Sequence, residues 1–368
     1  MFHTTACKMA AAPQTLPIIK DDTLTKPSSR KGRKLVRRAA VDHSQRLRWS
    51  FQALFLVLNV ALGIQFYLFV RYFETGGQGA AVPRPPGVEG WLPIAGLMNL
   101  KYWLTTGQVP HTHPAAMFLL LAFLVISVAF RKAFCSWLCP VGTISEALWR
   151  FGRRVFRRNL ALPRWTDLPL RSLKYILLGL FLYAVGSMSA ASLRAFMESP
   201  YGLIADVKML NFFRFLSLTG AIVLLILVLI SVVIQNFWCR YLCPYGALVG
   251  LASLVSPARI RRSADACIDC AKCAKACPSL LPVDKLASVR SAECTGCLEC
   301  ITACPAARAL EFSLPGKRNI PAWAMAAGIS LIFLGIVAIA KVSGHWDTEI
   351  PSALYQHLIA RAGEFSHP

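Results

Sequence analysis

The chain has 368 residues, of which 55% are hydrophobic and only 16% are charged, and its formal net charge is +22 at pH 7. Because soluble domains usually carry about 25% charged residues, the composition excludes an ordinary soluble protein and favours a membrane protein. A strongly basic chain can also indicate nucleic-acid binding, but the placement of the charges, given below, argues against nucleic acid as a partner.

The first 48 residues form a tail that is rich in Lys and Arg. The tail has no early apolar core, so we do not predict a standard cleavable signal peptide. Its basic run at 30–38 either anchors it against anionic lipid headgroups or is simply solvated. Cys7 stands alone in this tail and is interpreted as an incidental free thiol.

Apolar stretches of membrane length occur five times, at 50–70, 115–130, 175–191, 217–237 and 322–340. A transmembrane helix needs about 17–25 residues, so the second and third must be extended by flanking residues. The mixed stretch 91–104 is expected to be interfacial or re-entrant. The predicted fold class is therefore an α-helical membrane protein with about five transmembrane helices.

Lys and Arg are distributed very unevenly over the segments between these stretches. The tail and the loops 131–174 and 238–320 together hold 32, whereas 71–114, 192–214 and the C-terminal segment together hold 8. Because cytoplasmic loops carry the excess of Lys and Arg, we expect the N-terminus and the loop after the fourth stretch to be cytoplasmic. The C-terminus is expected outside, in the periplasm of a bacterial inner membrane.

Two cysteine pairs follow the second and fourth stretches in the same sequence pattern. Cys135 and Cys139 lie in FCSWLCPVG, and Cys239 and Cys243 lie in WCRYLCPYG, 104 residues further along. On a helix, cysteines at i and i+4 share a face, but their β-carbons lie about 5–6 Å apart, too far for an unstrained disulfide. The Pro after each second Cys either ends the span or opens the next helix.

Three interpretations of these pairs stay open. Together the pairs could supply four thiolates to an additional iron–sulfur centre or another thiophilic metal. They could instead act as redox-active dithiols, or pack as small residues between helices. The segment 141–158, which follows the first pair, alternates apolar side chains with Arg and predicts a basic amphipathic helix on the inner membrane surface.

Eight more cysteines form two copies of the pattern C-x2-C-x2-C-x3-C-P between the fourth and fifth stretches. In bacterial ferredoxins of this pattern, the fourth Cys of each run ligates the other cluster. We therefore predict two [4Fe-4S] clusters. The first is held by Cys267, Cys270, Cys273 and Cys304, and the second by Cys294, Cys297, Cys300 and Cys277. Zinc sites with four cysteine ligands are the alternative, but two full copies with their prolines favour iron–sulfur clusters.

These patterns divide the chain into five predicted parts. They are a basic cytoplasmic tail at 1–48, a four-helix membrane domain at 49–260, an inserted cytoplasmic α+β bacterial ferredoxin-like domain at 261–314, a fifth transmembrane helix at 315–341 and an external tail at 342–368. The expected outer side also holds titratable residues: His111 and His113 could accept protons or bind a metal, and Glu198 and Asp206 could take protons. Ordinary loop residues are the simpler interpretation of all four.

The order of motifs, from the paired C-x3-C-P runs to the double ferredoxin run, resembles the NapH/NosR/CcoG group of membrane-bound polyferredoxins. The resemblance covers about 50–314 and implies electron transfer between the quinone pool and a redox partner protein, as in a quinol dehydrogenase component. CcoG-like members imply the alternative, a maturation factor that reduces a metal or thiol for a respiratory metalloenzyme. From the lengths before the first stretch and after the fifth, we expect neither the outer flavin domain of NosR-like members nor the outer domain of CcoG-like members.

Overall fold

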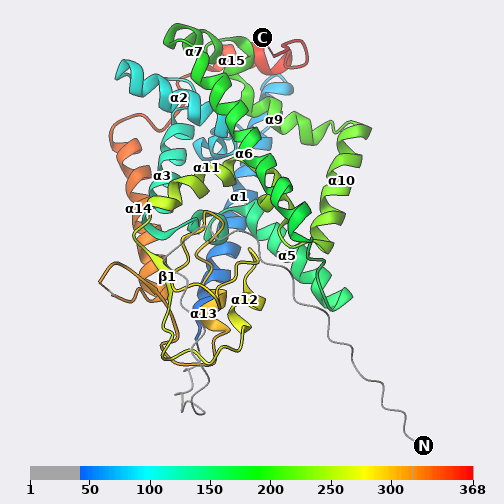
Figure 1. The fold of residues 1–368 in the computed structure, drawn as a ribbon. Helices are drawn as coiled ribbons and strands as arrows, with labels where there is room; N and C mark the ends of the chain where they lie inside the picture. Colours follow the sequence, from blue (N-terminus) through cyan, green and yellow to red (C-terminus); the bar gives the residue numbers. More distant parts are fainter. Residues whose placement is uncertain (1–41, 317, 368) are drawn as a thin grey trace, which may run out of the picture.

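The computed structural model describes residues 42–316 and 318–367, and helices dominate this part of the chain (Figure 1). Cys7 lies outside the described residues. The α-helices are α1 (Ser44–Glu74), α2 (Pro93–Thr106), α3 (Pro114–Phe130), α4 (Ala133–Trp137), α5 (Pro140–Phe156), α6 (Arg164–Ser187), α7 (Ala190–Met197), α8 (Pro200–Leu203), α9 (Ala205–Arg214), α10 (Leu218–Val233), α11 (Pro244–Ala252), α12 (Lys272–Ala276), α13 (Glu299–Thr302), α14 (Ala322–Val342) and α15 (Ser352–Ala360). Three short helical turns, η1 (Pro86–Trp91), η2 (Trp238–Leu242) and η3 (Ser253–Val255), and two strands, β1 (Arg259–Arg262) and β2 (Leu310–Ser313), complete the fold.

Three of the described helices are long and apolar enough to cross a membrane, namely α1, most of α6, and α14. The pair α9 and α10 makes a fourth candidate if it is counted as one span, although the two helices meet at 82°. α3 has 17 residues, at the short end of the range of about 17–25 residues for a spanning helix. The predicted helical membrane protein is therefore confirmed in its class, and the number of five spans stays a prediction.

α3 is an apolar helix that is largely buried. Pro114 occupies its first turn, where the missing backbone N–H costs nothing. Most of its side chains are buried against neighbours that include α2 and α14. The middle of α1 instead exposes Leu54, Val57 and Ile64, as expected of a helix face that contacts lipid.

The two ends of the membrane domain differ in what they carry (Figure 1). The segment with β1, α12 and α13 lies at one end, together with the start of α1, whose Ser44 Oγ is 3.0 Å from Thr302 Oγ1. α2, α7 and α15 lie at the opposite end, where Tyr355 packs edge-on against Phe69 near the end of α1. That the chain crosses a membrane five times in alternating direction stays a prediction. Which end faces the cytoplasm stays a prediction.

The cysteine-rich segment is closed by a two-stranded antiparallel sheet. β1 pairs with β2 so that Ile260 lies opposite Phe312, and both side chains are buried. The sheet brings the two ends of the segment together around both cysteine runs. β1 begins at Arg259, two residues before the predicted domain boundary at 261.

One hydrophobic core joins this segment to the membrane helices. Its buried members include Phe123 of α3, Trp137 of α4, Leu298 and Phe312 of the cysteine-rich segment, and Met325 of α14. Two hydrogen bonds fix the same contact: Trp137 Nε1 donates to the Gly296 carbonyl at 3.2 Å, and Ser136 Oγ donates to the Thr295 carbonyl at 2.6 Å. The segment therefore packs against the membrane domain as part of one body.

The predicted amphipathic helix is present as α5, and it exposes Phe151, Val155 and Phe156 beside its arginines. It packs against α10 at Gly152, where an added Cβ would lie 1.8 Å from the Val232 carbonyl oxygen. Only glycine permits this approach. That α5 lies on the membrane surface stays a prediction.

Candidate metal centres

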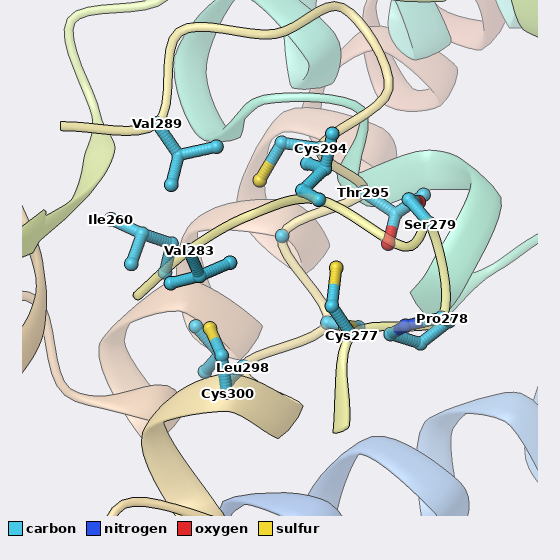
Figure 2. Close-up of a pocket in the computed structure, with 13 residues that line it drawn as sticks. Ile260, Cys277, Pro278, Ser279, Val283, Val289, Cys294, Thr295, Leu298 and Cys300 are labelled. Carbon is cyan, nitrogen blue, oxygen red and sulfur yellow. The ribbon is translucent and has the colours of Figure 1, made fainter. Parts of the chain in front are cut away.

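The first group of sites comes from the two ferredoxin-type runs. Among the cavities of the described residues, one is lined by Cys277, Cys294, Cys297 and Cys300. Figure 2 shows the sulfurs of Cys277, Cys294 and Cys300 around this cavity, with Ile260, Val283, Val289 and Leu298 as apolar neighbours. Another is lined by Cys267, Cys270, Cys273 and Cys304. Each predicted ligand quartet, including the cysteine contributed by the other run, therefore surrounds its own cavity.

The two runs have matching backbone kinks. Asp269 and Ala271 in the first run have φ of 52° and 54°, and the equivalent Gly296 and Leu298 in the second have 61° and 62°. Three of these four are non-glycine residues in the left-handed region, which is uncommon. Such turns aim consecutive N–H groups towards one point and suit an anionic group. The Asp269 N–H, for example, points at Cys267 Sγ at 3.5 Å.

These residues fit a [4Fe-4S] cluster in each cavity. All four donors are thiols, which suit iron–sulfur clusters, and apolar side chains shield the cavity of Figure 2. Burial raises the pKa of the Cys277 thiol to about 11, so without iron it remains protonated at neutral pH. Because the thiolate is the ligand, loading iron releases protons. The assignment of ligands to clusters stays a prediction.

Neither membrane pair lies on one continuous helix, which is the case that the i and i+4 spacing suggested. Cys135 lies in α4, but that helix ends at Trp137, and Cys139 is the N-cap of α5. Cys239 lies in η2, a short π-helix, and Cys243 is the N-cap of α11. Each pair therefore bridges a helix break, and the proline after the second cysteine opens the next helix.

Both N-cap thiols accept a hydrogen bond from a glycine. The Gly142 N–H donates to Cys139 Sγ at 3.5 Å, and the Gly246 N–H donates to Cys243 Sγ at 3.2 Å. The N-terminus of a helix carries a partial positive charge, which favours a thiolate over a thiol. The pattern C-P-x-G thus directs two helix N-termini at two sulfurs.

The fold brings the four membrane cysteines into one neighbourhood. The charges of Cys243, Cys139 and Cys135 all act on Cys239, although the pairs are far apart in sequence. A Cβ added at Gly246 would point between Cys243 Sγ and Lys132 Nζ, at 3.5 Å from each. This small cradle and the four thiol donors fit a thiolate-bound cluster. No three His, Cys, Asp or Glu side chains of the described residues gather tightly enough to share a single metal ion.

A polar cavity lies between the membrane pairs and the second ferredoxin quartet. Cys135 and Cys239 of the membrane pairs and Cys297 of the second quartet all line it. Its charged lining residues are Lys132, Glu146, Arg240 and Glu293. The second quartet therefore faces the membrane cysteines. None of the first quartet, which includes the exposed Cys270, lines that cavity.

Buried ion pairs hold the second quartet in place, and sequence patterns did not reveal them. Arg48 of α1 is fully buried and binds both carboxylate oxygens of Glu146 at 2.6 and 2.7 Å and Glu299 Oε1 at 2.9 Å. Glu299 lies between two cysteines of the second run. Removing one partner of a buried ion pair leaves the other uncompensated, so this network ties α1 and α5 to the cysteine run.

The titratable residues at the other end of the molecule separate into two groups. His113 is buried, and its ring contacts the Gly202 carbonyl at 2.9 Å. Arg84 lies beside His113 and forms ion pairs with Glu89 at 2.7 Å and with Asp206 at 2.6 Å. Burial alone would raise the pKa of Glu89, but the charge of Arg84 and the hydrogen bond with His113 lower it to about 2. The sequence pointed to His113 and Asp206 but missed Arg84 and Glu89.

The remaining two candidates at that end are on the surface. The His111 ring is 3.2 Å from Glu349, and Glu198 pairs with Arg194 at 2.8 Å. All four of these side chains are more than half exposed. His111 and His113 therefore belong to different surroundings.

Comparison with protein families matches both groups of cysteines. The family described as "4Fe-4S binding domain" matches twice, at 112–159 and 216–263, and these ranges contain the two membrane pairs. The "4Fe-4S dicluster domain" family matches 259–313, which contains all eight ferredoxin-type cysteines. The two matches of the first family confirm the repeat with its 104-residue offset.

Known relatives include YccM of Escherichia coli K12, named provisionally as an electron transport protein, which is 49% identical over 87% of this chain and 91% of its own length. The ferredoxin-type protein NapH of the same organism is 29% identical over 47% of this chain and 57% of NapH. The regulatory protein NosR of Pseudomonas aeruginosa PAO1 is 30% identical over 44% of this chain and 22% of NosR. No solved structure matches the chain. The chain therefore belongs to the family of membrane-associated, ferredoxin-type iron–sulfur electron transport proteins that includes YccM, NapH and NosR.

Proposed function

We propose that this protein carries electrons between the quinone pool and a redox partner protein through three iron–sulfur sites in a row. Cys135, Cys139, Cys239 and Cys243 form the membrane site, the Cys277, Cys294, Cys297 and Cys300 quartet the middle site, and the Cys267, Cys270, Cys273 and Cys304 quartet the outer site. When bound, a [4Fe-4S] cluster supplies one-electron transfer.

The cavity shared by Cys135, Cys239 and Cys297 is the observation that carries this order. It makes the membrane site and the middle site neighbours. The outer site includes the exposed Cys270, so it is the one that a soluble partner reaches most easily. Apolar side chains of the cysteine-rich segment keep water from the middle site, as a relay position requires.

The location of the membrane site supports a quinone as the reactant in the bilayer. Cys135 follows α3 directly and Cys239 follows α10, so both stand at the boundary of the apolar helices. Lipid-soluble quinones reach this depth, whereas water-soluble carriers do not. On the charge distribution, we place this end of the molecule, with the cysteine-rich segment and the N-terminus, on the cytoplasmic side of a bacterial inner membrane.

The experiment is an anaerobic electron-transfer assay on the purified, detergent-solubilised chain. A soluble quinol is mixed with the oxidised protein, and a soluble quinone is mixed with the dithionite-reduced protein. Cluster reduction or oxidation is followed by absorbance and EPR. We expect exchange in at least one direction, and we expect the Cys135→Ser/Cys139→Ser variant to lose it. The proposal is wrong if neither reagent exchanges electrons with a chain that carries its full complement of clusters.

A further inference from the structure

Lys132 is a buried cation between the two membrane cysteine pairs. It precedes α4, and only 3% of it is exposed. Its side chain lines the cavity that Cys135 and Cys239 also line, and its Nζ lies close to Cys243 across the Gly246 cradle. The charges that act on it are those of Cys135, Glu293, Cys243 and Cys239.

The carboxylate of Glu293 is already engaged by another lysine. Both oxygens of Glu293 accept hydrogen bonds from Lys174 Nζ, at 2.6 and 2.7 Å, and Tyr175 donates a third at 3.0 Å. Two buried ammonium groups therefore lie in the field of one carboxylate, and only Lys174 is hydrogen-bonded to it. A buried charge needs an opposite charge nearby, so this arrangement leaves one positive charge for the cysteines to balance.

The other cation at this cavity points to the same surplus. Arg240 is 6% exposed and pairs with Asp167 at 2.9 Å, but Asp167 also pairs with Arg171 at 2.5 Å. Arg240 Nη1 is buried and has no hydrogen-bond partner among the described residues. The groups around Glu293 and Asp167 therefore each hold more positive than negative charge, which suits an anionic cluster at the membrane cysteines. Glu146, the other carboxylate of the cavity, is paired with Arg48.

The sequence repeat places a neutral residue where the first copy of the motif has the lysine. The residue 104 positions after Lys132 is Asn236, which lines the same cavity and is neutral. Asn236 accepts a hydrogen bond from Ser145 Oγ at 3.2 Å. The cavity therefore receives a positive charge from only one of the two copies of the motif, at Lys132.

We propose that Lys132 is a positioning residue whose ammonium group raises the reduction potential of the cluster held by Cys135, Cys139, Cys239 and Cys243. This inference rests on the proposed membrane site. Reduction adds one electron to an already anionic thiolate-bound group. A fixed positive charge beside it stabilises the reduced form more than the oxidised form, so the potential rises. The reduction uses one electron and moves no proton to or from Lys132.

The test compares three variants of the full chain by EPR-monitored redox titration, with iron and sulfide analysis of each. Lys132→Gln removes the charge, and Lys132→Arg keeps it. Lys101→Gln is the control, because Lys101 donates to the carbonyls of Val185, Gly186 and Met188 away from this cavity. We expect Lys132→Gln to lower the midpoint potential of one of three centres. Lys132→Arg and Lys101→Gln should keep the wild-type value.

The remaining outcomes separate this inference from the proposed function. A third centre whose potential is the same in wild type and Lys132→Gln overturns the role of Lys132 and leaves the membrane site intact. A wild-type chain with only two centres overturns both. If the Lys132→Gln variant does not load the third centre, the Lys132→Arg variant decides between the two explanations. Wild-type loading and potential in Lys132→Arg support the inference, and loss of the third centre in Lys132→Arg overturns it.

Discussion

Cys139 and Cys243 occupy the same structural position in two copies of one motif: each is the N-cap of a helix and accepts a hydrogen bond from the glycine three residues later. The partner cysteine of each pair lies in a short helix that ends before the cap. The spacing of four residues therefore reflects a helix break, and each copy can turn two sulfurs towards a common centre.

Removing one pair should destroy the membrane site and spare the other two. We expect about twelve irons per wild-type chain and about eight in Cys135→Ser/Cys139→Ser or in Cys239→Ser/Cys243→Ser, since each [4Fe-4S] cluster needs its own thiolates. Iron and sulfide analysis with EPR of the reduced protein measures this. About eight irons already in the wild type, or full quinol-linked activity in both double variants, would contradict the prediction.

The two glycines of the repeated motif should respond differently to alanine. A Cβ at Gly142 would lie 2.2 Å from the Cys135 carbonyl oxygen, so Gly142→Ala should misfold or fail to insert. A Cβ at Gly246 meets nothing closer than 3.5 Å, so Gly246→Ala should fold. That methyl group occupies the cradle, however, and should lower loading of the membrane site. Expression, thermal stability and iron content of the two variants test this. Normal iron content in Gly246→Ala would show that cluster binding does not need the space at Gly246.

Arg48→Met should be strongly destabilising. The substitution leaves Glu146 and Glu299 buried with one cation fewer, and breaking a buried pair in this way costs about 3–5 kcal/mol. Arg46→Met is the matched control, because Arg46 lies two residues before Arg48 in the same helix and is exposed. Thermal unfolding in detergent gives the comparison. Equal unfolding midpoints for the two variants would show that the network contributes little.

The carboxylate of Glu89 should make the fold sensitive to acid. Its pKa is about 2 in the folded protein, below the ordinary value of 4.5, so its contribution to stability is complete above about pH 4.5 and declines as the pH falls towards 2. We expect the difference in unfolding midpoint between wild type and Glu89→Gln to be constant from pH 7 to 5 and to shrink below about pH 4.5. A difference that is independent of pH down to 3 would show that Glu89 is not ionised in the fold.

The two ends of the molecule should lie in different compartments. Reporter fusions after Ser313 and at the C-terminus test this in cells, and the charge asymmetry predicts cytoplasmic and periplasmic signals, respectively. The structure adds that α14 is the helix that separates the two points. Signals from one compartment would mean that α14 does not cross the membrane.

Local patterns in the sequence predicted the parts of the fold that depend on spacing. The runs at 267–278 and 294–305 predicted the grouping of cysteines that line each cavity, because this grouping follows from short spacings and one crossover. The same approach missed Arg48, Arg84 and Glu89. Each of them is buried by helices that are distant in sequence. A local sequence pattern therefore shows only a charged residue near a membrane segment and gives neither its burial nor its partners.

The helix breaks were the least predictable feature. The hydropathy of 217–237 indicates one span, whereas α10 ends at Val233 and a π-helical turn carries Cys239. α9 and α10 meet at 82°, although their combined composition suits a single helix. At the end of α10, Val232 packs against Gly152 of α5, and such packing competes with local helix propensity. The composition of the segment does not reveal this packing.

The core shared by α3, α14 and the cysteine-rich segment has a kinetic consequence. A redox domain on a flexible linker must diffuse between its donor and its acceptor, so its turnover slows in viscous solvent. Here Trp137 and Leu298 belong to one packed core, and Trp137 is hydrogen-bonded to the loop of the second cysteine run. The separation between the membrane cysteines and the middle quartet is therefore fixed by packing, and the proposed electron transfer between them needs no diffusion of a domain through solvent.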